Sequence, residues 1–127
     1  MADRHNGQIA LPEVGEGRML QVTKATAAHL ETALGDFVFL DRLLFGLPRC
    51  SPKCLDLMLE HCVVEADGKP VKGAAWPDNV PLEVLAEKSL DAVAWCFRGM
   101  SHADWVEKTK AQAAPAGDKN PTNGTEA

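Results

Sequence analysis

Apolar residues recur at helical spacing along most of this chain. Ala27, Leu30 and Leu34 fall at positions i, i+3 and i+7, and a stripe of similar spacing follows Ser51. The longest stripe begins after Pro81. We therefore expect a mainly α fold, a small bundle of four to five short helices. The predicted helices cover residues 24–34, 37–45, 52–64 and 81–98, with a last helix after Ser101.

Residues that favour helix ends stand at the boundaries of these segments. Thr23 and Ser51 are N-cap residues by type. Pro52 and Pro81 stand at first helical positions, where the missing N–H has no intrahelical partner to lose. Gly35 stands where a helix commonly ends in the left-handed conformation. The local sequence thus predicts the starts of three helices and the end of one.

Short β-compatible runs, residues 8–11 and 18–22, precede the first helix. A turn-rich stretch separates them, which predicts a short N-terminal β-hairpin. Such a hairpin needs a surface to pack on, because an isolated one is marginally stable. Farther along, residues 65–79 are predicted to form a loop that Val71 and Trp76 pin to the core.

The length of 127 residues predicts one domain. Residues 1–17 are rich in Gly, Pro and charge, and we expect them to form a flexible N-terminal segment. Residues 18–111 form the expected helical domain. Residues 112–127 contain Ala as their one type of apolar residue, so we expect a disordered tail there.

Composition and charge exclude several classes of function. A net charge of −5 argues against a broad phosphate-binding face, and an aromatic content of 6% without Tyr argues against base stacking. Neither a secretory signal nor a membrane-spanning apolar run is present. We expect a cytoplasmic protein that binds neither nucleic acid nor membrane. Glu83 and Glu87 lie one helical turn apart, on a face that is either solvated or an acidic strip for a basic partner.

The four cysteines are expected to be reduced thiols. Cys50, Cys54 and Cys62 lie near His61 and suggest a zinc site, but Cys54 and Cys62 fall on an apolar helical stripe, as buried thiols do. Cys96 lies on the long helix. The sequence carries no Gly-rich phosphate loop and no histidine pair at metal spacing. It therefore predicts no metal, no cofactor and no enzymatic activity.

The segment over residues 37–45 is apolar on nearly all sides, which implies burial or a partner surface. Gly46 and Pro48 are expected to end this helix. Large aromatic and aliphatic side chains either complete a small core or anchor another chain. The candidate partner-binding residues are Phe37, Phe39, Leu40, Leu43, Leu44, Phe45, Trp95 and Trp105.

The order of these elements resembles a known family. The run QVTKATAAHLETALG (residues 21–35) is followed by a short apolar helix, a helix that starts with proline, a variable loop and the run PLEVLAEKSLDAVAW (residues 81–95). A polar tail rich in Ala and Pro closes the chain. This order resembles the small tail assembly chaperones of long-tailed bacteriophages and gene transfer agents. The resemblance covers residues 18–100 and includes no catalytic motif.

The resemblance implies a helical protein that acts in the cytoplasm of an infected host cell. Such a protein coats the long tape measure protein before the tail tube polymerises, by shielding apolar helical stripes. The tape measure protein and the tail tube protein are the partners it implies, and a homo-oligomer is a further expectation. Two alternatives stay open: a small acidic phage regulatory or inhibitory protein that binds a host factor, and a structural component of the particle.

Overall fold

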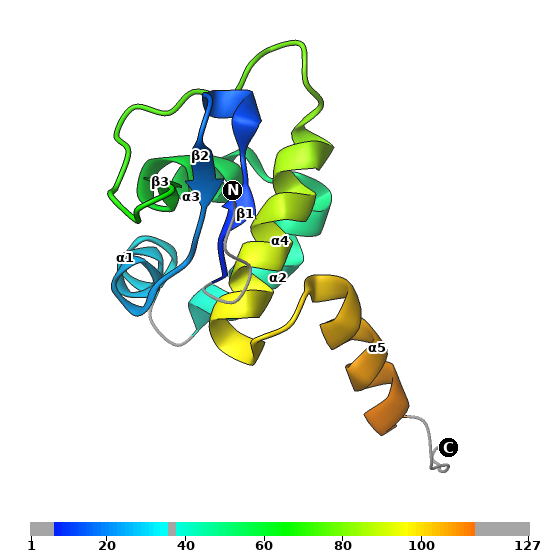
Figure 1. Ribbon diagram of the computed structural model, residues 1–127. Coiled ribbons are helices and arrows are strands. Elements are labelled where there is room, and N and C mark those ends of the chain that lie inside the picture. Colours follow the sequence, from blue (N-terminus) through cyan, green and yellow to red (C-terminus); the bar gives the residue numbers. More distant parts are fainter. Residues whose placement is uncertain (1–6, 36–37, 114–127) are drawn as a thin grey trace.

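The computed structural model describes residues 7–35 and 38–113, and the expected mainly helical fold is confirmed (Figure 1). Within these residues, five α-helices are combined with a three-stranded antiparallel sheet. The helices are α1 (Lys24–Leu34), α2 (Phe39–Gly46), α3 (Pro52–His61), α4 (Leu82–Arg98) and α5 (His102–Ala113), the strands are β1 (Ile9–Ala10), β2 (Arg18–Leu20) and β3 (Val63–Glu65), and the 3₁₀ turns are η2 (Pro12–Val14) and η4 (Leu47–Arg49).

The predicted helix starts are confirmed by their capping hydrogen bonds. The Thr23 hydroxyl accepts from the Thr26 backbone N–H at 3.2 Å, and Thr26 Oγ1 accepts from the Thr23 N–H at 2.7 Å. The Ser51 hydroxyl accepts from the Cys54 N–H at 3.5 Å. Pro81 is the N-cap of α4, so this helix begins one residue later than predicted.

The predicted N-terminal hairpin is present and belongs to a larger sheet. β1 and β2 are antiparallel, with Ile9 opposite Leu20. β3 extends the sheet on the other side of β2, with Arg18 opposite Glu65. The strands therefore have the packing partner that an isolated hairpin lacks.

The third helix ends earlier than its apolar stripe suggests. We expected it to run to residue 64, but α3 ends at His61 and the next residues enter β3. Val63 and Val64 are β-branched and favour extended backbone. The Cys62 carbonyl accepts from the Gln21 N–H at 2.9 Å, which ties this turn to the strand side of the fold.

Residues 7–17 lie in the folded body, which differs from the flexible segment expected over residues 1–17. Leu11 is fully buried and Ile9 is nearly so. Residues 1–6 lie outside the described part of the chain. At the other end, α5 includes residues 112 and 113, and the expected disorder of the tail falls on residues 114–127, outside the described residues.

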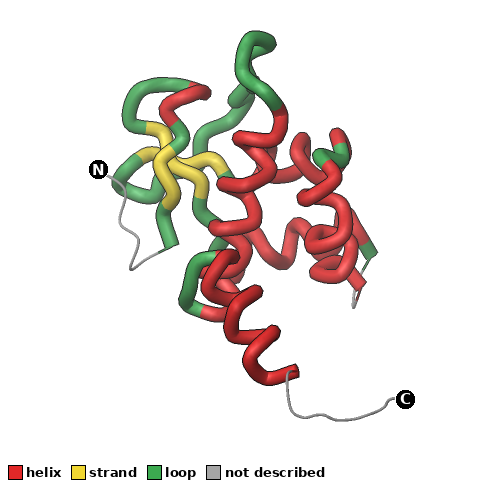
Figure 2. Tube along the Cα trace, turned by 90° about the vertical axis from the view of Figure 1, so that its right-hand side faces the viewer, coloured by secondary structure: helices red, strands yellow, loops and turns green. Residues whose placement is uncertain are grey.

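The core is built around α4. This helix contacts β1, β2, η4, α3 and α5. Figure 2 shows the strands on the left and most of the helical tube to their right. Small residues alternate with large ones along the buried part of α4, which allows close approach by its neighbours. Its buried residues are Leu85, Ala86, Ser89, Leu90, Ala92, Val93 and Ala94.

The long connection between β3 and α4 is fixed to the body at two points. The Val71 N–H donates to the Val63 carbonyl at 2.9 Å, and Val71 and Trp76 both pack against the core. The Trp76 indole N–H donates to the Val80 carbonyl at 2.9 Å. The expectation that Val71 and Trp76 pin this segment is confirmed.

α2 ends at Gly46, one residue later than the predicted end at residue 45, and η4 continues directly from it, so that Pro48 lies in a 3₁₀ turn. Gly46 is buried, and a Cβ atom built on it would lie 2.7 Å from Cys54 Sγ and 3.2 Å from Ser51 Cβ. The missing side chain therefore allows the first turn of α3 to lie against the end of α2.

We expect Gly46→Ala to lower the free energy of unfolding by about 1–3 kcal/mol, because the added methyl group overlaps Cys54. Urea denaturation measures this change. Helix propensity alone favours Ala by about 1 kcal/mol, so an unchanged or raised stability would contradict the packing argument. A double-mutant cycle with Cys54→Ala is the control, and the Gly46→Ala cost should shrink in that background.

An ion pair joins η2 to α4. Lys88 Nζ lies 2.9 Å from both carboxylate oxygens of Glu13, and both side chains are partly buried. Burial raises the pKa of Glu13, but the hydrogen bond and charge of Lys88, together with a backbone hydrogen bond, outweigh it. The Glu13 pKa therefore lies below its ordinary value.

Because the folded-state pKa of Glu13 is lowered, the carboxylate stabilises the fold above its ordinary pKa of 4.5, and this contribution is lost as pH falls through the lowered value. We expect Glu13→Gln to destabilise the protein at pH 7 by about 1 kcal/mol and to approach wild-type stability in acid. Thermal unfolding across this pH range measures the difference. Glu16→Gln, at an exposed residue of the same segment, is the control and should show no such convergence.

Candidate partner-binding surface

The apolar residues of α2 divide between the core and the surface. Leu43 is fully buried, whereas Phe39, Leu40 and Leu44 are half-buried and pack against the core. Phe45 is 64% exposed. The helix is therefore partly interior and partly open.

This division corrects part of the predicted partner surface. Leu43 cannot reach another chain in the folded state, because no part of its side chain is exposed. Phe39 lies 6.0 Å from Phe97, centroid to centroid, and so belongs to a contact between α2 and α4. The predicted residue Phe37 lies outside the described residues.

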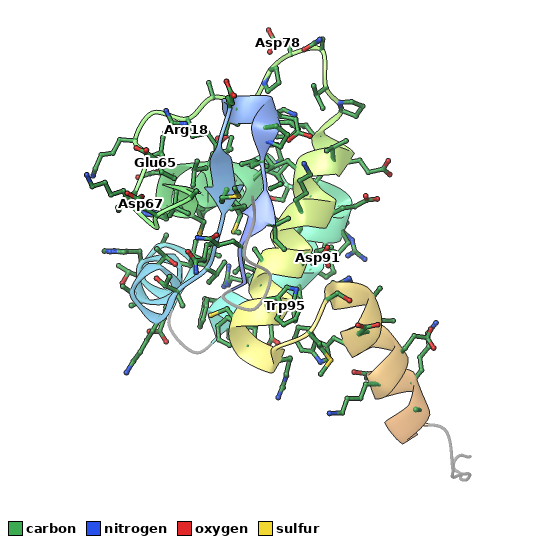
Figure 3. The ribbon with its side chains drawn as sticks, viewed as in Figure 1. Arg18, Glu65, Asp67, Asp78, Asp91 and Trp95 are labelled. Carbon is green, nitrogen blue, oxygen red and sulfur yellow. The ribbon has the colours of Figure 1, made fainter. Side chains whose placement is uncertain are left out.

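α5 is docked on α4 by its first turn and projects from the body (Figure 1). Asp91 of α4 accepts a hydrogen bond from the His102 N–H at 2.9 Å, and Figure 3 shows Asp91 beside the start of α5. Ser101 caps the same turn by accepting from the Asp104 N–H at 3.2 Å. These bonds satisfy free amides of the helix end and fix the point where α5 leaves α4.

An apolar groove of about 320 Å³ lies between α2 and α5. We call it the α2–α5 groove. Its apolar walls are Leu44 from α2 and Trp105 and Val106 from α5. His102 and Lys110 add polar groups to its lining. Two of the predicted residues, Leu44 and Trp105, are thus brought together.

Val106, which is 37% exposed, also lines this groove and was not among the residues predicted from the sequence. Val106 is the large apolar residue next to Trp105, and that adjacency was the available signal. Leu44, on the opposite wall of the groove, lies about sixty residues earlier in the chain. No local sequence pattern therefore predicts that Leu44 and Val106 line the same groove.

Trp105 also faces a second hollow, on the side of α5 toward the end of α4. Phe97, Met100 and Lys108 line this hollow, which has a volume of about 430 Å³. The Arg98 guanidinium lies 5.3 Å from the Trp105 ring centroid. The indole is therefore half-buried, with space on two sides.

Trp95 does not line the α2–α5 groove. It is half-buried on α4 and packs against the core (Figure 3). A Cβ atom built on Gly7 would lie 3.2 Å from Trp95 Cβ, so the start of the described chain lies against it. The Trp95 indole Nε1 is buried and has no hydrogen-bond partner among the described residues. The structure thus packs Trp95 against the core and outside the α2–α5 groove.

The cysteines are not arranged as a metal site. Cys54 and Cys62 are buried in the core, and His61 stacks on His29 with ring centroids 5.4 Å apart. Burial raises the pKa of the Cys62 thiol to about 12 and also raises the pKa of Cys96. Over residues 7–35 and 38–113, no three His, Cys, Asp or Glu side chains are grouped to hold a metal ion.

Comparison with known proteins identifies no relative of this chain. The chain matches no protein-family model, no curated protein and no solved structure. Within the described residues, no helix has the length and apolar character needed to cross a membrane. The α2–α5 groove and the surface residues around it are therefore the features of this chain that bear on its function.

The Asp91 cap is expected to stabilise the first turns of α5 against local unfolding. Asp91→Ala removes the acceptor of the His102 N–H, and the loss of such a cap costs about 1 kcal/mol. Amide exchange in the first turns of α5 should accelerate roughly fivefold, as measured by hydrogen–deuterium exchange. Glu87→Ala, at an exposed carboxylate one turn earlier on α4, is the control. Equal exchange in the two variants would show that Asp91 does not hold α5.

Proposed function

We propose that this protein is a non-enzymatic phage tail assembly chaperone that shields apolar helical segments of a tape measure protein in the host cytoplasm. The observation that carries the proposal is the open α2–α5 groove, with Leu44 on one wall and Trp105 and Val106 on the other. The resemblance in element order supplies the family of the partner, and the groove supplies its chemistry.

An amphipathic helix is the ligand that suits this groove. α5 has 12 residues and is therefore about 18 Å long, which corresponds to roughly three turns of a bound helix. Apolar residues at i, i+3 or i+4 of the client would lie against Trp105, Val106 and Leu44. Lys110 and His102 lie in the same groove and suit acidic or polar flanks on that helix.

The attachment of α5 suits a protein that must later release its client. Among the neighbouring elements, α4 is the one that α5 contacts extensively. Elements with few packed neighbours have low local stability, which allows binding and release without unfolding the body. The net charge of −5 favours solubility of the free chain while its groove is open.

The test is recovery of the tape measure protein by the tagged chain. Co-expression with a phage tape measure protein should give a co-purifying complex. Val106→Asp places a charge in the groove and should reduce recovery at least tenfold, because a central anchor is worth about 2 kcal/mol or more. Val38→Asp is the matched control, since Val38 is 44% exposed but does not line the groove.

Two outcomes would overturn the proposal in different ways. Equal recovery with both Asp variants would exclude the groove as the binding site. Failure of the wild-type chain to recover any long helical protein would exclude the chaperone function itself. Mass spectrometry of purified particles separates the structural-component alternative, because a chaperone is absent from the mature particle.

A further inference from the structure

Phe45 is the most exposed large apolar side chain in the described part of the chain, and it lines a hollow together with three cationic side chains. The Arg49 guanidinium lies 3.9 Å from the ring centroid, and Arg49 Nη1 donates to the Phe45 carbonyl at 2.8 Å. Arg42 and Lys53 line the same hollow of about 280 Å³. We call Arg42, Phe45, Arg49 and Lys53 the Phe45 patch.

The charge of this patch is not neutralised within the described residues. No carboxylate lines the hollow, and the ion pairs formed over residues 7–35 and 38–113 involve other cations. Three cations in one hollow without a carboxylate are unexpected in a chain with a net charge of −5. The patch therefore suits a surface that is acidic and also presents an apolar side chain.

The same chain carries such a surface at the start of α4. Leu82 is 44% exposed, and the exposed carboxylates of Glu83 and Glu87 follow it, one turn apart. Neither carboxylate forms an ion pair with a described residue. We call Leu82, Glu83 and Glu87 the Leu82 face. It resembles the Phe45 patch in presenting an exposed apolar side chain and opposes it in charge.

We infer that two copies of this chain associate, with the Leu82 face of one copy on the Phe45 patch of the other. The occupant is a second copy because both complementary surfaces are present in one sequence. Phe45 and Leu82 lose exposed apolar area in the contact, and the charges around them set its orientation. No residue of the α2–α5 groove belongs to either surface, so self-association does not depend on the proposed function.

Sedimentation velocity of the full chain tests this inference. From roughly 10 to roughly 500 µM protein, we expect concentration-dependent association at low salt. It should weaken at about 500 mM NaCl, where the charges are screened. Arg49→Glu and Phe45→Ser should each weaken association roughly tenfold or more. Lys72→Glu changes the net charge as much as Arg49→Glu does but lies in an exposed loop, so it should change association little.

A charge swap identifies the two surfaces directly. The Arg49→Glu/Lys53→Glu chain and the Glu83→Lys/Glu87→Lys chain should each be monomeric alone and should associate when mixed. A monomeric wild-type chain at low salt would overturn the inference. Association that survives Arg49→Glu, that is lost equally in Lys72→Glu, or that is not restored by mixing would overturn it as well. Circular dichroism of each variant confirms that the helices are intact.

Discussion

The packing of α4 requires small residues at its middle, because the strands, η4 and α3 all approach it. Ala86, Ala92 and Ala94 are almost wholly buried, and so is Ser89, whose hydroxyl has no hydrogen-bond partner among the described residues. A larger side chain at these positions would separate the neighbours that define the core. The position of α5 depends on the same helix, since Asp91 holds the first amide of α5.

The exposure of Phe45 follows from the same packing. Leu43 and Leu47 are four residues apart and both are fully buried, so they define the inner face of α2 and the turn that continues it. Phe45 lies midway between them, which places it about 200° around the helix from Leu43 and therefore on the outer face. The close approach of Gly46 to Cys54 holds the helix in this orientation.

Local signals in the sequence predicted where the helices begin, but they did not predict which residues meet at the surface. Thr23 and Ser51 predicted their helix starts because a cap involves residues within one turn. β3 was missed because Val63 and Val64 continue the apolar pattern of α3, and their strand pairing depends on residues more than forty positions away. Leu44 and Trp105 were each predicted as binding residues, but the groove that they share was not, because their proximity depends on the fold.

An arginine contacts each of the two aromatic side chains to which we assign binding roles. Arg49 lies over Phe45, and Arg98 lies near the Trp105 ring. At a solvated surface such a contact contributes about 0.5–1 kcal/mol, whereas full burial of a large apolar side chain contributes about 1.5–3 kcal/mol. Phe45 is nevertheless 64% exposed and Trp105 is half-buried, so each arginine leaves its ring accessible and is too weakly held to keep a larger apolar surface from packing against it. Because burial of the ring contributes more than its contact with arginine, both aromatic side chains can serve as binding anchors.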